Sequence, residues 1–149
     1  MTDWTSLRGI FEAAIEKFGV INAVLSNAGM NHENLLKEDF DSAGQLKEPD
    51  LKCLEVNLIA HVYVAKLALH FFKRGPKGPR QIVFTASAAS YIESPPLYQY
   101  GAAKTGLVGL MRALRPTVQT WNVSINIVAP WMTRMFSKPL EFNCDLYET

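Results

Sequence analysis

Three residues that can move protons or bind a polar oxygen lie close together in the second half of the chain. Tyr100 and Lys104 are four positions apart, so on a helix they share one face. An ammonium beside a phenol favours the phenolate and makes proton transfer to or from a substrate oxygen efficient. Ser87 follows an apolar run, where its hydroxyl could steady the same oxygen. The three residues predict the chemistry of carbonyl reduction and alcohol oxidation.

The spacing of Tyr100 and Lys104 has an ordinary alternative explanation, because such a pair often arises by chance in a chain of this length. The whole arrangement is more demanding. It joins a strand end that carries Ser87, a loop with small residues and prolines, and a helix that begins near the tyrosine. The hypothesis of a site therefore depends on what the other strand ends carry.

Length and composition indicate ordinary globular material. The chain has 149 residues, 48% hydrophobic and 19% charged, and we expect 1–149 to form one domain. The net charge of +1 predicts neither nucleic acid nor an anionic membrane as a partner. A basic cluster at 73–80 surrounds a Gly/Pro loop and is interpreted as a solvated turn. Cys53 and Cys144 lack the spacing of a zinc site or a disulfide framework, so we expect no metal and a reducing, cytoplasmic compartment.

Helical periodicity recurs in three stretches. In the first, Asp3 or Thr5 can cap a stripe of apolar residues, and Gly19 ends it. The second is apolar nearly all round, yet the polar residues inside it indicate a core helix rather than a membrane span. The third is rich in small residues, and Pro116 loosens its end. The expected helices are one that follows its cap at Asp3 or Thr5 and runs to Phe18, and two at about 51–73 and 98–114.

Short apolar runs between these helices have the pattern of strands. We expect strands at 20–26, 81–86 and 124–129, the first covered on both faces, and a long connection at 30–49. Because helices and strands alternate, the strands should be parallel and joined by crossover helices. The sequence therefore predicts an α/β protein with a layered sheet.

Four features fall at the ends of predicted strands or in the helices that follow. They are Ser26-Asn27-Ala28-Gly29, Asn57, Ser87 with Tyr100 and Lys104, and Val128-Ala129-Pro130. Together they resemble the short-chain dehydrogenase/reductase (SDR) family over about residues 3–137. That family has Asn-Asn-Ala-Gly after its fourth strand, an Asn in the next helix, a Ser and Tyr-x-x-x-Lys set, and Pro-Gly after its sixth strand. The resemblance implies a partial Rossmann-like three-layer fold, the second half of a doubly wound sheet.

The resemblance also implies catalytic roles. Tyr100 would donate or accept the proton, while Lys104 would activate that phenol and hold the nicotinamide ribose. Ser87 would orient the substrate oxygen. Asn57 would hold a water that links Lys104 to solvent, the alternative being a core amide that kinks its helix.

Further residues are implied to line the cofactor and substrate sites. Asn27, Ala28 and Gly29 would shape the floor of the cofactor site, and Pro130 and Thr133 would flank the nicotinamide. The segment 88–97, which includes Tyr91 and Pro95, would face the substrate. The cofactor would be NAD or NADP, and the substrate a small alcohol or ketone.

Departures from the family pattern are equally informative. The nine glycines never form the G-x-x-x-G-x-G turn that receives a pyrophosphate, so the chain resembles the second half of the family without its first βαβαβ unit. The usual last strand is missing as well. Ser26 replaces the first Asn, Trp131 replaces Gly, and Met135 stands where a Thr is common. Strand 20–26 would then form an exposed apolar edge.

Two functional hypotheses follow. The first is an oxidoreductase of the SDR type that interconverts a secondary alcohol and a ketone with NAD or NADP. The second is a non-catalytic remnant or interaction module that cannot bind a dinucleotide alone. The resemblance implies that helices 51–73 and 98–114 pair between subunits of a homo-oligomer. The sequence decides neither the substrate nor NAD against NADP.

Overall fold

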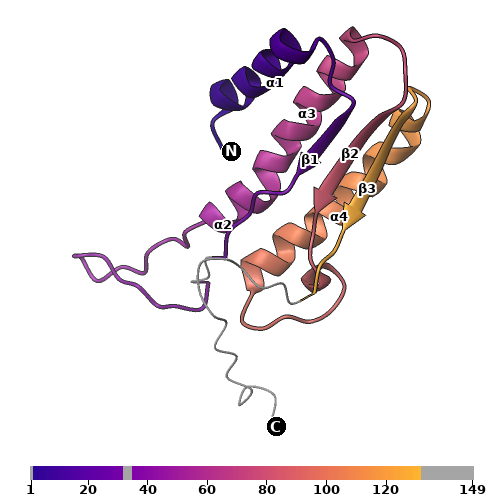
Figure 1. The fold of residues 1–149 in the computed structure, drawn as a ribbon. Coiled ribbons are helices and arrows are strands. Elements are labelled where there is room, and N and C mark those ends of the chain that lie inside the picture. The colour runs from indigo at the N-terminus through magenta and orange to yellow at the C-terminus, as the bar shows by residue number, and fades with distance from the viewer. Residues whose placement is uncertain (1, 32–34, 132–149) are drawn as a thin grey trace.

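The protein is described by a computed structural model that covers residues 2–31 and 35–131 (Figure 1). Its three strands form one parallel sheet in the order β1-β2-β3. The predicted α/β fold with parallel strands and crossover helices is therefore confirmed. The elements are α1 (Trp4–Phe18), β1 (Ala23–Ser26), α2 (Lys52–Leu54), η1 (Glu55–Ile59), α3 (Ala60–Arg74), β2 (Arg80–Thr85), η2 (Ala88–Ser90), α4 (Tyr98–Gln119) and β3 (Val123–Val128).

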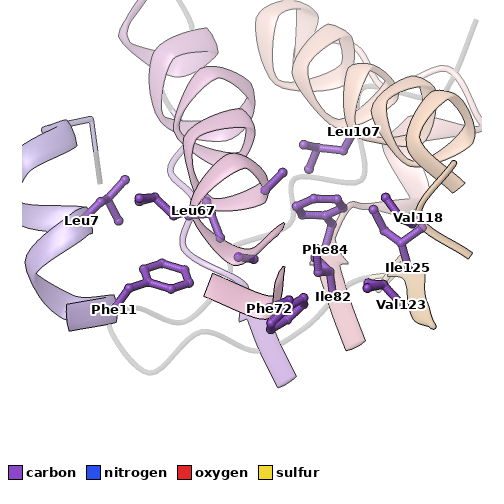
Figure 2. Close-up of a cluster of buried hydrophobic side chains, with 13 residues drawn as sticks. Leu7, Phe11, Leu67, Phe72, Ile82, Phe84, Leu107, Val118, Val123 and Ile125 are labelled. Atoms are coloured by element: carbon purple, nitrogen blue, oxygen red, sulfur yellow. The ribbon is translucent and has the colours of Figure 1, made fainter. Parts of the chain in front are cut away.

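The core lies between the sheet and the helices (Figure 2). Ile82 and Phe84 on β2 and Ile125 on β3 are almost completely buried, and they alternate with residues that are more exposed. Because successive side chains of a strand point to opposite faces, this alternation shows that one face of the sheet carries the core. Leu67 of α3 and Leu107 of α4 cover that face.

Strand β1 differs from its prediction in length and in cover. It begins at Ala23 rather than at residue 20, because its pairing with β2 runs from Ala23 to Ser26. Leu25 keeps 73% of its surface exposed, whereas Ser26 is buried. The expectation of a strand covered on both faces is therefore wrong for the described residues, in which the helices cover one face. A hollow of about 340 Å³ lies between α1 and β1.

The first helix has the predicted ends. The Asp3 carboxylate accepts a hydrogen bond from the Ser6 backbone N–H at 2.6 Å. At the other end, Gly19 adopts a φ of 73° and donates its N–H to the Ile15 carbonyl at 2.8 Å. Glycine adopts this left-handed conformation without steric cost.

The second predicted helix is a continuous helical stretch with an irregular start. It begins at Lys52, whose N–H bonds to the Asp50 carboxylate at 2.8 Å, and it is π-helical over η1 before α3 continues to Arg74. By length and composition, Lys52–Arg74 could cross a membrane. Seven residues of α3 are buried, however, and most of them belong to the core cluster that contacts the sheet, as expected of a core helix.

The third helix is longer than predicted. It continues through Pro116 and ends at Gln119. Proline removes one backbone N–H and usually breaks a helix. Here Val118, 1% exposed, packs into the core one half-turn beyond the proline. Burial of this side chain accounts for the additional turn.

Candidate active site

The carboxyl ends of the three strands point to the lower end of Figure 1, where α2 lies and α4 begins. This shared edge brings together residues that are far apart in the chain. Ser26 ends β1, Thr85 ends β2, and Lys104 lies in the second turn of α4. Parallel α/β sheets carry their ligand sites at this edge.

Lys104 is a buried cation, only 2% exposed. Its Nζ donates a hydrogen bond to the Thr85 carbonyl at 2.8 Å. The same nitrogen lies 5.6 Å from the centre of the Tyr100 ring, so the two residues share one face of α4 as the spacing predicts. Burial lowers the pKa of the Lys104 ammonium, because removal from water disfavours the charged form.

Gly29 lies directly against this lysine and against Asn57. A β-carbon at position 29 would come within 2.7 Å of Asn57 Oδ1 and 3.4 Å of Lys104 Nζ. The turn that follows β1 therefore needs a residue without a side chain at this point. Asn27 and Ala28, which precede it, are exposed to solvent. In the predicted floor of a cofactor site, Asn27 and Ala28 are therefore open to solvent, whereas Gly29 packs against Lys104.

Asn57 is completely buried in the π-helical stretch. Its Nδ2 donates to the Met30 carbonyl at 2.7 Å and to the Cys53 carbonyl at 2.9 Å, and its Oδ1 accepts from the Met30 N–H at 3.2 Å. The bond to Cys53, four residues earlier, engages a backbone acceptor of the helix, which is consistent with the local π geometry. The role of a helix-distorting core amide therefore fits these contacts, and the water-holding role stays a prediction.

Ser87 begins the loop that runs from β2 to α4. Its Oγ accepts a hydrogen bond from the Ala89 N–H at 3.2 Å and so caps the short helix η2. The Ala88 N–H donates to the Pro130 carbonyl at 3.0 Å, which ties this loop to the end of β3. The residue that follows Ser87 is therefore bonded to Pro130, another residue of the predicted site.

Helix η2 packs closely on the start of α4. At Gly101 a β-carbon would lie 3.2 Å from Ser94 Oγ and 3.7 Å from the Ala89 carbonyl. This glycine follows Tyr100, so the loop that carries Ser87 approaches the helix turn that carries the phenol. Tyr100 itself is half-buried.

The remaining predicted residues lie at the margin. Tyr91 is 58% exposed and Pro95 is also exposed, both in the loop between η2 and α4. Thr133 lies outside the described residues. The substrate-facing and nicotinamide-flanking roles of these three residues stay predictions.

Sequence reasoning noted Ser26 only as a departure from the family motif, and it gave no role to Thr85 or His61. Thr85 accepts from Lys104 through its carbonyl, and its hydroxyl donates to Asn27 Oδ1 at 2.8 Å. Its place two residues before Ser87, at the strand end, was a usable signal. Ser26 Oγ lies 2.6 Å from His61 Nδ1. The spacing of His61 four positions after Asn57 indicates a shared helix face, but the partner, 35 residues away, could not be inferred from it.

Comparison with known proteins identifies the family of this chain. The model of the short chain dehydrogenase family matches residues 1–139. A short-chain dehydrogenase/reductase, prx4, from Penicillium roqueforti is 40% identical over 134 residues, which are 89% of this chain and 39% of the fungal protein. ATR7 from Stachybotrys chlorohalonatus, of the same description, is 31% identical over 143 residues, or 95% of this chain and 43% of that protein.

Solved structures agree on the fold. A short chain dehydrogenase from Mycobacterium avium superposes with a TM-score of 0.75 at 26% identity, over 90% of this chain and 46% of that one. Carveol dehydrogenase from Mycobacterium avium in complex with NAD gives a TM-score of 0.71 at 22% identity, over 87% and 44%. The chain is a Rossmann-like α/β protein. It belongs to the short-chain dehydrogenase family, and it spans about two-fifths of the length of the curated relatives described above.

Proposed function

We propose that this chain carries the acid–base half of an SDR oxidoreductase that interconverts a secondary alcohol and a ketone with NAD or NADP. The observation that carries the proposal is the Tyr100–Lys104 pair. A buried ammonium lies 5.6 Å from the centre of a half-buried phenol ring, at the carboxyl edge of a parallel sheet. In the proposed roles, Tyr100 passes a proton to or from the substrate oxygen, and Ser87 holds that oxygen by a hydrogen bond.

The residues fit the nicotinamide end of a dinucleotide. An ammonium has three N–H donors, and among the described residues Lys104 uses one of them, toward Thr85. Its other donors would hold ribose hydroxyls, and the turn at Asn27–Gly29, which lies against this lysine, would line the cofactor site. When bound, the dinucleotide supplies or accepts a hydride at the substrate carbon. Pyrophosphate binding requires a Gly-rich turn at a helix N-terminus, a pattern that this sequence does not contain.

The lack of a Gly-rich turn in this sequence favours a second candidate function. The outer edge of β1 is open in the described residues, and Leu25 on it is 73% exposed. A chain with the acid–base residues but no pyrophosphate turn would act as an interaction module unless another polypeptide completes the sheet. We also propose that copies of the chain associate through α3 and α4, where Val62 and Tyr98 are each 39% exposed. We further propose that the protein is cytoplasmic, a compartment in which the buried thiol of Cys53 stays reduced.

The test is a chimera in which this chain replaces the matching segment of the prx4 relative, which then contributes the rest of the fold. Turnover of a secondary alcohol with NAD or NADP is followed by nicotinamide absorbance across a panel of substrates. We expect turnover that depends on the dinucleotide. A folded chimera that binds the dinucleotide but turns over no alcohol or ketone would favour the interaction module.

A further inference from the structure

One buried polar pair lies beside the proposed acid–base residues without belonging to them. Ser26, at the end of β1, and His61, in the first turn of α3, are 3% and 0% exposed. Ser26 Oγ lies 2.6 Å from His61 Nδ1, and His61 Nε2 lies 3.0 Å from the Ala28 carbonyl. Both ring nitrogens are therefore bonded, as buried polar groups require.

The partners determine which nitrogen carries the proton. The Ala28 carbonyl can only accept a hydrogen bond, so Nε2 carries the hydrogen and donates it. Nδ1 is then the acceptor, and the Ser26 hydroxyl donates to it. Burial, reinforced by the positive charge of Lys104, lowers the pKa of His61 to about 4. The ring is thus neutral near pH 7, in one tautomer and one orientation.

This ring holds the turn that packs on Lys104. The Ala28 carbonyl, bonded to His61, directly precedes Gly29, which lies against Lys104 Nζ and Asn57 Oδ1. Asn57 in turn bonds both the N–H and the carbonyl of Met30. Asn57 and His61 are four positions apart on one helical stretch. One helical stretch therefore bonds both ends of the 28–30 turn, at Ala28 through His61 and at Met30 through Asn57. The hydrogen bond from Ser26 orients the His61 ring for its bond to Ala28.

We infer that His61, oriented by Ser26, is a positioning residue that holds the 28–30 turn against Lys104 and Asn57. Its importance for catalysis rests on the proposed function, whereas the positioning itself is a property of the folded chain. Ser26 stands where the family motif has an asparagine, so the serine–imidazole pair is a feature of this chain rather than of the shared motif. Loss of the pair should loosen the turn and let water reach Lys104.

The experiment uses the 149-residue chain and three variants. His61→Phe keeps a ring to pack at the edge of Phe84, 6.1 Å away between ring centres, but removes both hydrogen bonds. Ser26→Ala is the milder change and removes only the bond that orients the ring. His70→Phe is the matched control, because His70 lies on the exposed side of the same helix.

Two readouts separate positioning from general stability. Amide hydrogen exchange by NMR compares the Met30 N–H, which bonds to Asn57, with amides of the central core strands. Loss of the His61 bonds should accelerate exchange at Met30 by about tenfold relative to the core amides. The Lys104 ammonium, titrated through its side-chain carbon signals, should show a pKa that rises toward the ordinary value, since burial is what lowers it. His70→Phe should change neither.

The inference is overturned if Met30 and the core amides accelerate equally in folded His61→Phe and Ser26→Ala, or if the pKa of Lys104 does not move. Should His61→Phe fail to fold, Ser26→Ala decides on the same two readouts. Both readouts are independent of turnover in the chimera. If exchange at Met30 and the pKa of Lys104 change as expected but the chimera is inactive, the positioning is supported and the proposed function is refuted. If neither changes but the chimera is active, the proposed function is supported and the positioning is refuted.

Discussion

Gly29→Ala should destabilise the chain through one identifiable contact. The new β-carbon would lie 2.7 Å from Asn57 Oδ1, closer than such atoms approach in real structures. Asn57 cannot move away cheaply, because its Nδ2 is fixed between the Met30 and Cys53 carbonyls at 2.7 and 2.9 Å. Relief therefore requires a shift of the turn and loss of the bond from the Met30 N–H to Oδ1.

The expected loss in the free energy of unfolding has two contributions. Overpacking of a rigid interior costs about 1–3 kcal/mol, and one lost hydrogen bond adds about 1 kcal/mol. We expect the free energy of unfolding, measured by urea denaturation, to fall by about 2–4 kcal/mol. Gly9→Ala is the matched control: it lies inside α1 with nothing within 4 Å of a new β-carbon, and it should stabilise by about 0.5–1 kcal/mol. A loss below about 0.5 kcal/mol for Gly29→Ala would refute the packing of this turn on Asn57.

Three further predictions concern acidity, cofactor and association. Because the pKa of His61 is about 4 in the folded chain against 6.5 ordinarily, its contribution to stability is complete above pH 6.5 and is lost as pH falls toward 4, by at most about 3 kcal/mol. Urea denaturation at pH 7 and pH 5 should show a smaller loss for His61→Phe than for the natural chain, and equal losses would contradict it. The 149-residue chain alone should bind NAD and NADP weakly or not at all by calorimetry, whereas micromolar affinity, about 8 kcal/mol, would contradict the missing pyrophosphate site. With Leu25 and Ile10 exposed by 73% and 65%, the chain should be oligomeric or poorly soluble by light scattering, and a monodisperse monomer at about 50 μM would refute this.

Local patterns predicted the parts of the fold that local physics decides. Helix α1 has a capping aspartate, one apolar stripe and a terminal glycine, and its ends agree with the prediction within a residue or two. The spacing of Tyr100 and Lys104 is likewise a property of one helix, and the structure places both on one face. These features need no information from distant parts of the chain.

Features that depend on distant contacts were predicted less well. Helix α4 passes through Pro116 because Val118 is buried by the core, and propensity alone does not show that burial. The π-helical stretch contains Asn57, whose side chain bonds the carbonyls of Cys53 and of Met30, and Met30 lies 27 residues earlier in the chain. The Ser26–His61 bond closes over 35 residues. The partners of these hydrogen-bonding side chains can be identified only once the folded sheet brings the strand ends together.

The central claim is that Tyr100 and Lys104 act as an acid–base pair, and the most direct test is the effect of their substitution in the chimera with the prx4 relative. Tyr100→Phe keeps the ring but removes the hydroxyl, so kcat should fall by about 10²–10⁴ with little change in dinucleotide affinity. Lys104→Ala should weaken both kcat and dinucleotide affinity, because the ammonium is proposed to serve both. Near-full activity of Tyr100→Phe, or unchanged dinucleotide affinity and kcat for Lys104→Ala, would contradict the assignment of this edge of the sheet as a dehydrogenase site.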